Sequence, residues 1–281
     1  MRKLTPLVFL FIFLALFCTQ ALAEEKPAKQ NVENLPWSEF NINMGVFLSS
    51  TNSNVRLSAK GIGVGIDVED ALGLDTTTNV LRLGGTWRFS DNRRHRADVS
   101  WFALRRNGDT TLGRDIVING VTYPTGTAIS TALDLDVYKT SYTYSFLQDD
   151  RMDVGFGLGL YIMPISFDFN ASGFVTGDAS ESVTAPLPVF GLRADYALTP
   201  KWFLKTSMDF FYLEYKQFRG AVFDTRLALE YKAFKHVGFG LGVDNFRLKV
   251  EGEGEDYPEI DLNGQIEYNY FGAMLYTNVY F

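Results

Sequence analysis

Residues 154–162 read VGFGLGLYI, and this short run decides the fold class. In an extended chain its apolar side chains fall on one face, while Gly155, Gly157 and Gly159 fall on the other. A helix, with about 3.6 residues per turn, would mix these two sets. Residues 237–243 (VGFGLGV) repeat the pattern. The alternation therefore predicts β-strands with one apolar face.

Similar strands recur along the chain, separated by connections that alternate in length. Short polar turns are expected at 90–94, 148–151, 199–200 and 234–236, and longer polar segments at 50–78, 107–130, 170–183 and 252–264. Short turns that alternate with long loops are typical of outer-membrane barrels, in which the short turns face the periplasm. The predicted strands are 38–49, 79–89, 95–106, 131–147, 152–169, 184–198, 201–215, 220–232, 237–251 and 265–281.

We therefore predict an all-β fold, an antiparallel up-and-down transmembrane β-barrel of about ten strands. Eight and twelve strands are the alternatives. The count depends on residues 55–68 (VRLSAKGIGVGIDV), which form either a hairpin within the first loop or an extra pair of spanning strands.

The N-terminus has the features of a signal peptide over residues 1–23. A basic start is followed by an apolar run at 7–17, which is shorter than the ~20 residues that a transmembrane helix needs. Cleavage is expected after the small residues Ala21 and Ala23, so that Glu24 becomes the first mature residue.

The rest of the chain is expected to be a single domain. Residues 24–37 are polar and aperiodic and are predicted to form a periplasmic tail, and residues 38–281 the barrel. Cys18, the one cysteine of the sequence, lies inside the signal, so no disulfide is expected in the mature chain.

The last strand carries the sharpest motif. Phe281 ends the chain, and Leu275, Thr277 and Val279 share its face. In this motif the sequence resembles Gram-negative outer-membrane β-barrel proteins, whose last strand ends in an aromatic residue read by the barrel-assembly machinery. The resemblance implies an outer-membrane location after export to the periplasm. Within that class the chain is loosely similar to the small OmpW and OmpA-type barrels.

Aromatic residues cluster at the predicted periplasmic strand ends. They are Trp87, Phe89, Tyr144, Phe146, Tyr196, Trp202, Tyr231 and Phe281. Membrane barrels carry such a girdle at the bilayer interface. The girdle and the strand lengths argue against the alternative of a soluble lipocalin-like barrel, whose apolar face would point inward.

If the apolar face meets lipid, the other face fills the lumen. That face carries a network of both signs: Arg82, Arg88, Asp98, Lys139, Asp153, Arg193, Asp195, Lys205, Asp209, Asp224, Arg226, Glu230, Lys232 and Asp244. A barrel of about this size has an interior that side chains can fill, and charges buried there must be paired. We expect a largely closed, charge-paired lumen, with a narrow passive channel as the alternative. On this view Arg226→Ala should lower stability.

Enzymatic chemistry is the less favoured interpretation. Outer-membrane lipid enzymes and proteases resemble one another in needing a histidine near the extracellular rim, whereas His95 and His236 fall at predicted periplasmic turns. Weak metal candidates are Glu253, Glu255, Asp256 and Glu259 in the last long loop, where a divalent cation could bind.

These observations predict a structural or surface-interaction role without a cofactor. The expected partners are outer-membrane lipid and lipopolysaccharide, and the barrel-assembly machinery during biogenesis. The formal net charge of −7 gives no basic footprint for nucleic acid.

Overall fold

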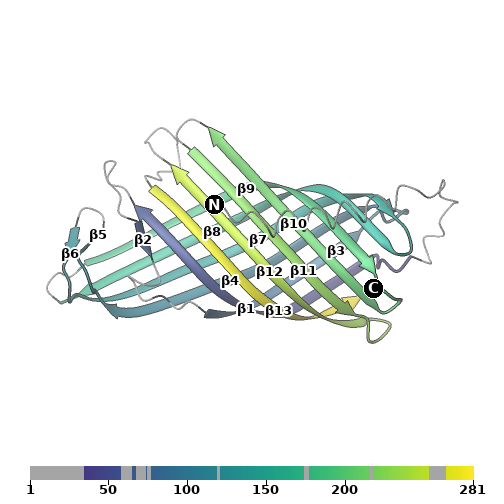
Figure 1. The fold of residues 1–281 in the computed structure, drawn as a ribbon, viewed down its shortest axis with the longest axis horizontal. Helices are drawn as coiled ribbons and strands as arrows, with labels where there is room; N and C mark the ends of the chain where they lie inside the picture. The colour runs from purple at the N-terminus through teal and green to yellow at the C-terminus, as the bar shows by residue number, and fades with distance from the viewer. Residues whose placement is uncertain are drawn as a thin grey trace, which may run out of the picture. The chain divides into compact units, whose positions relative to one another are not determined.

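The computed structural model describes residues 35–57, 65–67, 74, 77–118, 121–173, 177–215, 218–252 and 264–281. Within residues 34–281, ten long antiparallel strands close into a barrel (Figure 1). The strands of the wall are β1 (Phe40–Leu57), β3 (Thr77–Arg88), β4 (His95–Thr111), β7 (Ala128–Gln148), β8 (Met152–Ser172), β9 (Gly177–Ala197), β10 (Trp202–Tyr215), β11 (Phe218–Tyr231), β12 (Val237–Gly252) and β13 (Gly264–Tyr280). Among the described residues, no helix is long and apolar enough to cross a membrane.

Each strand pairs with its neighbour along the chain, and β13 pairs with β1 to close the ring. This confirms the predicted up-and-down topology and the preferred number of strands. Residues 55–68, for which the sequence left two alternatives, include β2 (Gly65–Asp67). This strand pairs with the end of β1 away from the short turns, as a hairpin within the first loop. A second hairpin, β5 (Ile116–Ile118) with β6 (Val121–Tyr123), lies in the connection between β4 and β7.

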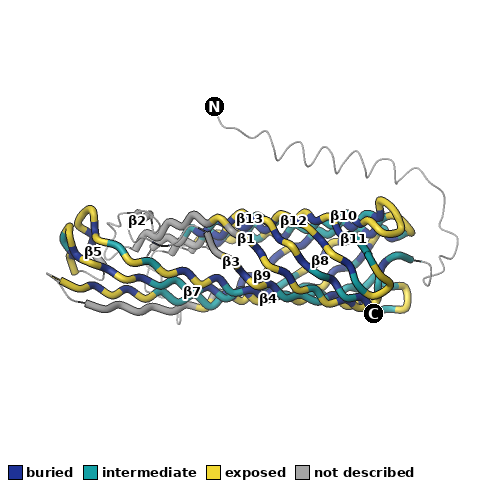
Figure 2. Tube along the Cα trace, turned by 90° about the horizontal axis from the view of Figure 1, so that it is seen from below, coloured by how far each residue is buried: buried dark blue, intermediate teal, exposed yellow. Residues whose placement is uncertain are grey.

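In the part of the wall near the short turns, buried and exposed residues alternate along each described strand (Figure 2). On β1, Ile42, Met44 and Val46 point outward and are exposed, whereas Asn41 and Phe47 are buried in the lumen. The outward apolar positions form a belt around the barrel, consistent with strands of ~9–11 residues that cross a bilayer at a tilt.

The strands run well beyond this belt, and some of them extend further than the sequence analysis predicted. β1 continues through residues 50–57, which had been assigned to a loop, and these residues pair with 264–271 of β13. β7, β8 and β9 each reach 21 residues. Above the membrane the outward face no longer needs apolar side chains, so the period-two contrast fades although the hydrogen-bonded ladder continues.

Two ladders of the wall stop before their strands end among the described residues. That of β3 with β4 ends at Arg82 and Phe102, although β3 begins at Thr77 and β4 continues to Thr111. β9 pairs with β8 as far as Gly177, but its pairing with β10 ends at Phe190 and Phe210. Pro186 and Pro188 come next on β9, and because they lack an N–H they cannot extend that ladder toward β10.

Candidate functional site

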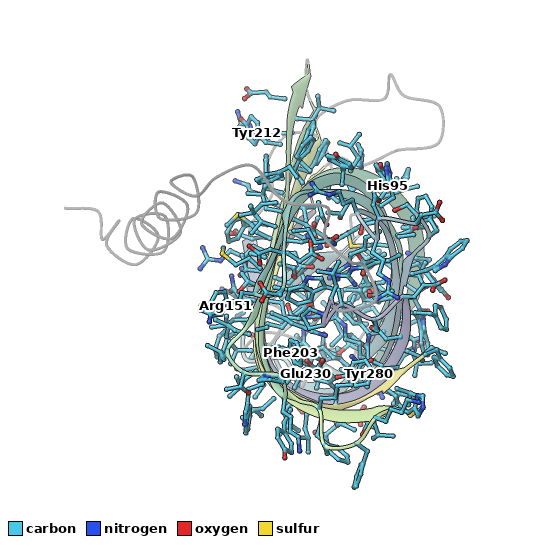
Figure 3. The ribbon with its side chains drawn as sticks, turned by 90° about the vertical axis from the view of Figure 1, so that its right-hand side faces the viewer. His95, Arg151, Phe203, Tyr212, Glu230 and Tyr280 are labelled. Atoms are coloured by element: carbon cyan, nitrogen blue, oxygen red, sulfur yellow. The ribbon has the colours of Figure 1, made fainter. Side chains whose placement is uncertain are left out.

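The lumen gathers the charged residues that the sequence analysis singled out. Thirteen of the fourteen lie on inward-facing positions of the strands, and Lys232 lies directly after β11. The view along the barrel shows Phe203, Glu230 and Tyr280 pointing into an interior filled with side chains (Figure 3). The alternation of each strand places these residues inside, because successive side chains point to opposite faces of a sheet.

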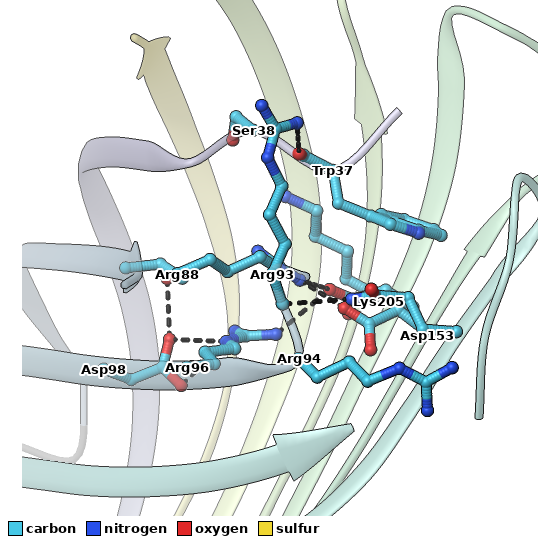
Figure 4. Close-up of polar contacts among 12 residues, drawn as sticks. Trp37, Ser38, Arg88, Arg93, Arg94, Arg96, Asp98, Asp153 and Lys205 are labelled. Atoms are coloured by element: carbon cyan, nitrogen blue, oxygen red, sulfur yellow. Dashed lines mark hydrogen bonds and ion pairs between the residues drawn. The ribbon is translucent and has the colours of Figure 1, made fainter. Parts of the chain in front are cut away.

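The layer nearest the short turns is an arginine–aspartate cluster from four strands (Figure 4). Nη2 of Arg88 lies 2.5 Å from Oδ2 of Asp153 and 3.7 Å from Oδ2 of Asp195. Arg96 donates to Asp195 at 3.1 Å and pairs with Asp98 at 2.8 Å. Each of the three carboxylates thus faces at least one guanidinium, which offsets the penalty of burying charge.

Glu230 is the centre of a second cluster. Its carboxylate is 1% exposed and accepts hydrogen bonds from Tyr276 (3.0 Å), Asn278 (3.1 Å) and Tyr280 (2.6 Å). Nζ of Lys205 lies 2.7 Å from its Oε1. The strands β10, β11 and β13 therefore meet at one carboxylate, whose oxygen atoms are fully used.

Lys232 contributes to the same end of the lumen in another way. Its Nζ lies 4.8 Å from the centroid of the Tyr280 ring, as a cation–π contact.

A third cluster forms around Asp244, which is 1% exposed. Arg82 reaches its Oδ2 at 2.5 Å from across the lumen, and Arg226 reaches the same oxygen at 2.9 Å from the adjacent strand. The two arginines differ in burial: the side chain of Arg82 is 5% exposed and that of Arg226 is 24% exposed.

The fourth cluster joins two carboxylates through one hydroxyl. Asp209 and Asp224 are cross-strand neighbours, and the Tyr161 hydroxyl lies 2.6 Å from the first and 2.9 Å from the second. The cations beside them are Arg193, 2.7 Å from Asp209, and Lys139, which pairs with Asp224. A phenolic hydroxyl has one proton, so it donates to one of these carboxylates at a time.

The ammonium of Lys139 also sits among aromatic rings. Its Nζ lies 4.7 Å from the centroid of Tyr161, 5.2 Å from Phe102 and 5.5 Å from Phe246. Aromatic faces stabilise a cation that has lost its water. Lys139 thus marks the boundary between the charged layers and an apolar layer.

The apolar layer fills the lumen on the side of the charges away from the short turns. Its buried members include Phe47, Phe102, Val137, Met163, Val189, Phe246, Leu248 and Tyr270. The ring of Tyr270 stacks on Phe246 with centroids 5.1 Å apart and meets Phe47 edge-on at 5.3 Å. Aromatic and aliphatic side chains thus occupy this part of the lumen.

Two further contacts cover the ends of the barrel interior. At the short-turn end, Trp37 is 3% exposed, packs against Phe203 and donates from its indole N–H to the carbonyl of Asp149 at 2.8 Å. At the other end, Tyr123 of the β5–β6 hairpin packs on Phe169 with ring centroids 5.1 Å apart. The end of the predicted periplasmic tail therefore packs into the mouth of the barrel.

A polar cavity of about 140 Å³ lies between the charged clusters. It is lined by residues that include Arg82 and Asn278, whose Nε and Oδ1 atoms have no hydrogen-bond partner in the described protein. A polar space of this size can hold several water molecules, which would satisfy such atoms.

The sequence analysis missed several members of these clusters. They are Arg96, Tyr161, Tyr276, Asn278 and Tyr280. Arg96 and Tyr161 share the face of a strand with Asp98 and Asp153, which the sequence analysis had chosen. Tyr276, Asn278 and Tyr280 lie on the face of the last strand opposite to that of Phe281. The signal was present, but attention to formal charge left out the tyrosine hydroxyls, and Arg96 was left out although it lies in the predicted strand 95–106.

The remaining sites of the sequence analysis are placed as follows. Phe281 is 65% exposed, donates its N–H to the carbonyl of Phe40 at 2.9 Å and lies beside the Phe40 ring; Val279, Thr277 and Leu275 continue the outward face. The cleavage residues Ala21, Ala23 and Glu24 and the metal candidates Glu253, Glu255, Asp256 and Glu259 lie outside the described residues. Within the part of the chain that is described, no group of three metal-ligating side chains occurs.

Both histidines lie at short turns, as expected. Nδ1 of His95 lies 2.7 Å from the Tyr142 hydroxyl on the outer wall, and Nδ1 of His236 lies 2.9 Å from the carbonyl oxygen of Tyr280.

Comparison with known proteins supports the fold and little else. No protein-family model matches the sequence, and no curated protein matches it significantly. Among solved structures, the outer membrane protease OmpT of Escherichia coli superposes with a TM-score of 0.55 at 13% identity, over 86% of this chain and 97% of that one. OprG of Pseudomonas aeruginosa gives 0.37 at 11% identity, over 88% and 99%, and at that score the likeness carries no argument. This chain therefore has the fold of Gram-negative outer-membrane β-barrels, loosely similar to several of them.

Proposed function

We propose that this protein is an outer-membrane barrel with a closed lumen, which acts through its extracellular surface and does not conduct solutes. The observation that carries the proposal is the stacking of closed layers: paired charges, then packed aromatic and aliphatic side chains. The charged layers alone could admit water. The apolar layer, in which Phe246 and Met163 are 0% exposed, is the barrier to hydrophilic solutes.

The length of the strands supports a role outside the membrane. β7, β8 and β9 reach 21 residues, about twice what a tilted strand needs to cross a bilayer. The wall beyond the belt is stabilised by an apolar cluster of its own, which includes Leu112, Ile129 and Phe169. A barrel that served only as an anchor would not need this extension.

Single-channel recording in planar bilayers tests the closed lumen. The refolded protein, checked by its heat-modifiable band on an unboiled gel, is expected to give no conductance steps. Regular steps, together with liposome swelling that scales with the size of small sugars, would contradict the proposal.

A narrow passive channel is the second candidate, and the polar cavity of about 140 Å³ favours it. The same recordings decide between the two. An enzymatic role has less support, because His95 and His236 both lie at short turns and neither is hydrogen-bonded to a carboxylate in the described residues.

A further inference from the structure

The outer wall of β11, β12 and β13 changes character at the upper margin of the apolar belt. Leu227, Val243 and Leu275 point outward within the belt and are 44%, 41% and 66% exposed. Further from the short turns on the same outward face, the side chains become Asn245, Arg247 and Asn269. A bilayer centred on the apolar belt would have its headgroups near these positions.

A groove of about 610 Å³ lies in the wall at this height. Its outward-facing lining comes from Ser50, Ala221, Phe223, Asn245, Arg247, Lys249, Glu267, Asn269 and Phe271. The strand register explains the grouping: Arg247 is directly opposite Phe223 on β11 and Asn269 on β13, and Asn245 is opposite Phe271. The groove is thus amphipathic: Asn245 lies level with exposed Phe271, and Arg247 and Asn269 lie one outward position beyond them.

One positive charge of the groove, that of Arg247, is not neutralised within the described protein. Arg247 is exposed and makes no ion pair or hydrogen bond with another described residue. Lys249, one outward position higher, is opposite Glu267 in the register. By contrast, Arg105 on the wall at β4 is also partly exposed but lies 2.7 Å from Asp136.

We propose that this groove binds the phosphate of a phosphorylated outer-leaflet glycolipid, with its acyl chains along the belt below. Arg247 would hold the phosphate through charge-assisted hydrogen bonds, Asn245 and Asn269 would add neutral donors, and Phe271 and Leu275 would contact the chains. The height of the groove selects a lipid over a soluble ligand, because its apolar floor is continuous with the lipid-facing belt. The inference goes beyond the proposed function and holds whether or not the lumen conducts.

Native mass spectrometry of the refolded full-length barrel in detergent micelles tests this. The probes are lipid A with both phosphates and the same lipid after enzymatic dephosphorylation. The barrel should retain the phosphorylated lipid preferentially. Arg247→Ala should weaken that binding about tenfold, as expected for losing one charge-assisted hydrogen bond. Arg105→Ala is the matched control and should bind like the wild type, because Arg105 is already neutralised.

Three outcomes would overturn the proposal. They are equal retention of the two lipids, equal loss of binding in Arg247→Ala and Arg105→Ala, and displacement of the lipid by millimolar inorganic phosphate, which would assign the site to free phosphate. If Arg247→Ala does not fold, as judged by heat-modifiability, Arg247→Gln and the comparison of the two lipids on the wild-type protein still decide the question.

Discussion

Asp244 shows how unequal two ion pairs on one carboxylate can be. Arg82 is buried and reaches Asp244 from a strand 162 residues away in sequence, whereas Arg226 is partly exposed on the adjacent strand. From the sequence we expected Arg226→Ala to leave a buried carboxylate unpaired. The structure changes the expected size of that effect, because Arg82 stays on the same oxygen after Arg226 is removed.

We therefore predict that Arg82→Ala lowers the free energy of unfolding by about 3 kcal/mol, the lower end of the usual cost of breaking a buried pair, because Arg226 stays on Asp244. Arg226→Ala should lower it by about 1 kcal/mol, as for a partly exposed pair. Urea unfolding in micelles, followed by tryptophan fluorescence, measures both. Equal effects of the two substitutions would show that the lumen does not bury Arg82 as described.

Glu230 allows a second test at the same scale. Removing its carboxylate in Glu230→Ala leaves Lys205, two tyrosine hydroxyls and one amide without their acceptor, so about 3–5 kcal/mol should be lost. Lys205→Met is the control: it removes the cation but leaves the three neutral donors on Glu230, and Lys205 is 27% exposed. The control should cost clearly less in the same unfolding experiment; an equal cost would mean that the ion pair, and not the hydrogen-bond set, holds this cluster.

At the scale of the strands, β12 makes room for the side chains of β13. The ring of Tyr276 lies over Gly240, where an added Cβ would fall 2.1 Å from its Cζ. The Tyr276 hydroxyl is bonded to Glu230, so the ring cannot move away without losing that hydrogen bond. The alternating glycines of residues 237–243 thus have a specific use.

Gly240→Ala should accordingly destabilise the barrel by about 1–3 kcal/mol, the range for overpacking. Gly85→Ala on β3 is the matched control, since the nearest atoms to its added Cβ lie 3.6 Å away, at ordinary contact distance. The midpoint of heat-modifiability on gels compares the two. Should Gly85→Ala prove as disruptive, loss of glycine from a strand would itself be the cause, and the Tyr276 contact would not.

For the whole molecule, closure by successive layers predicts which substitutions would open the lumen to ions. Trp37→Ala removes the cover at the short-turn mouth but leaves the apolar layer intact, so it should not conduct in planar bilayers. Phe102→Ala combined with Phe246→Ala removes two rings from the apolar layer, and this double variant should give small conductance steps. Conductance by Trp37→Ala alone would place the barrier at the mouth instead.

The sequence by itself determined the strands and their two faces, and favoured ten spans, because period-two alternation is local and the bilayer demands an apolar outer face. It also placed both histidines at short turns and the charges inside. Those features depend on neighbours within a few residues, so no knowledge of the closed barrel was needed.

The tertiary structure alone decided which charges meet and where the lumen closes. Arg82 and Asp244, or Lys139 and Asp224, face each other only after β13 pairs with β1 and the tilt of the strands brings distant positions to one height. The extension of β1 through residues 50–57 and the exposed guanidinium of Arg247 became visible in the same way. Alternation specifies the face on which a side chain lies, but barrel closure and shear specify what lies opposite it.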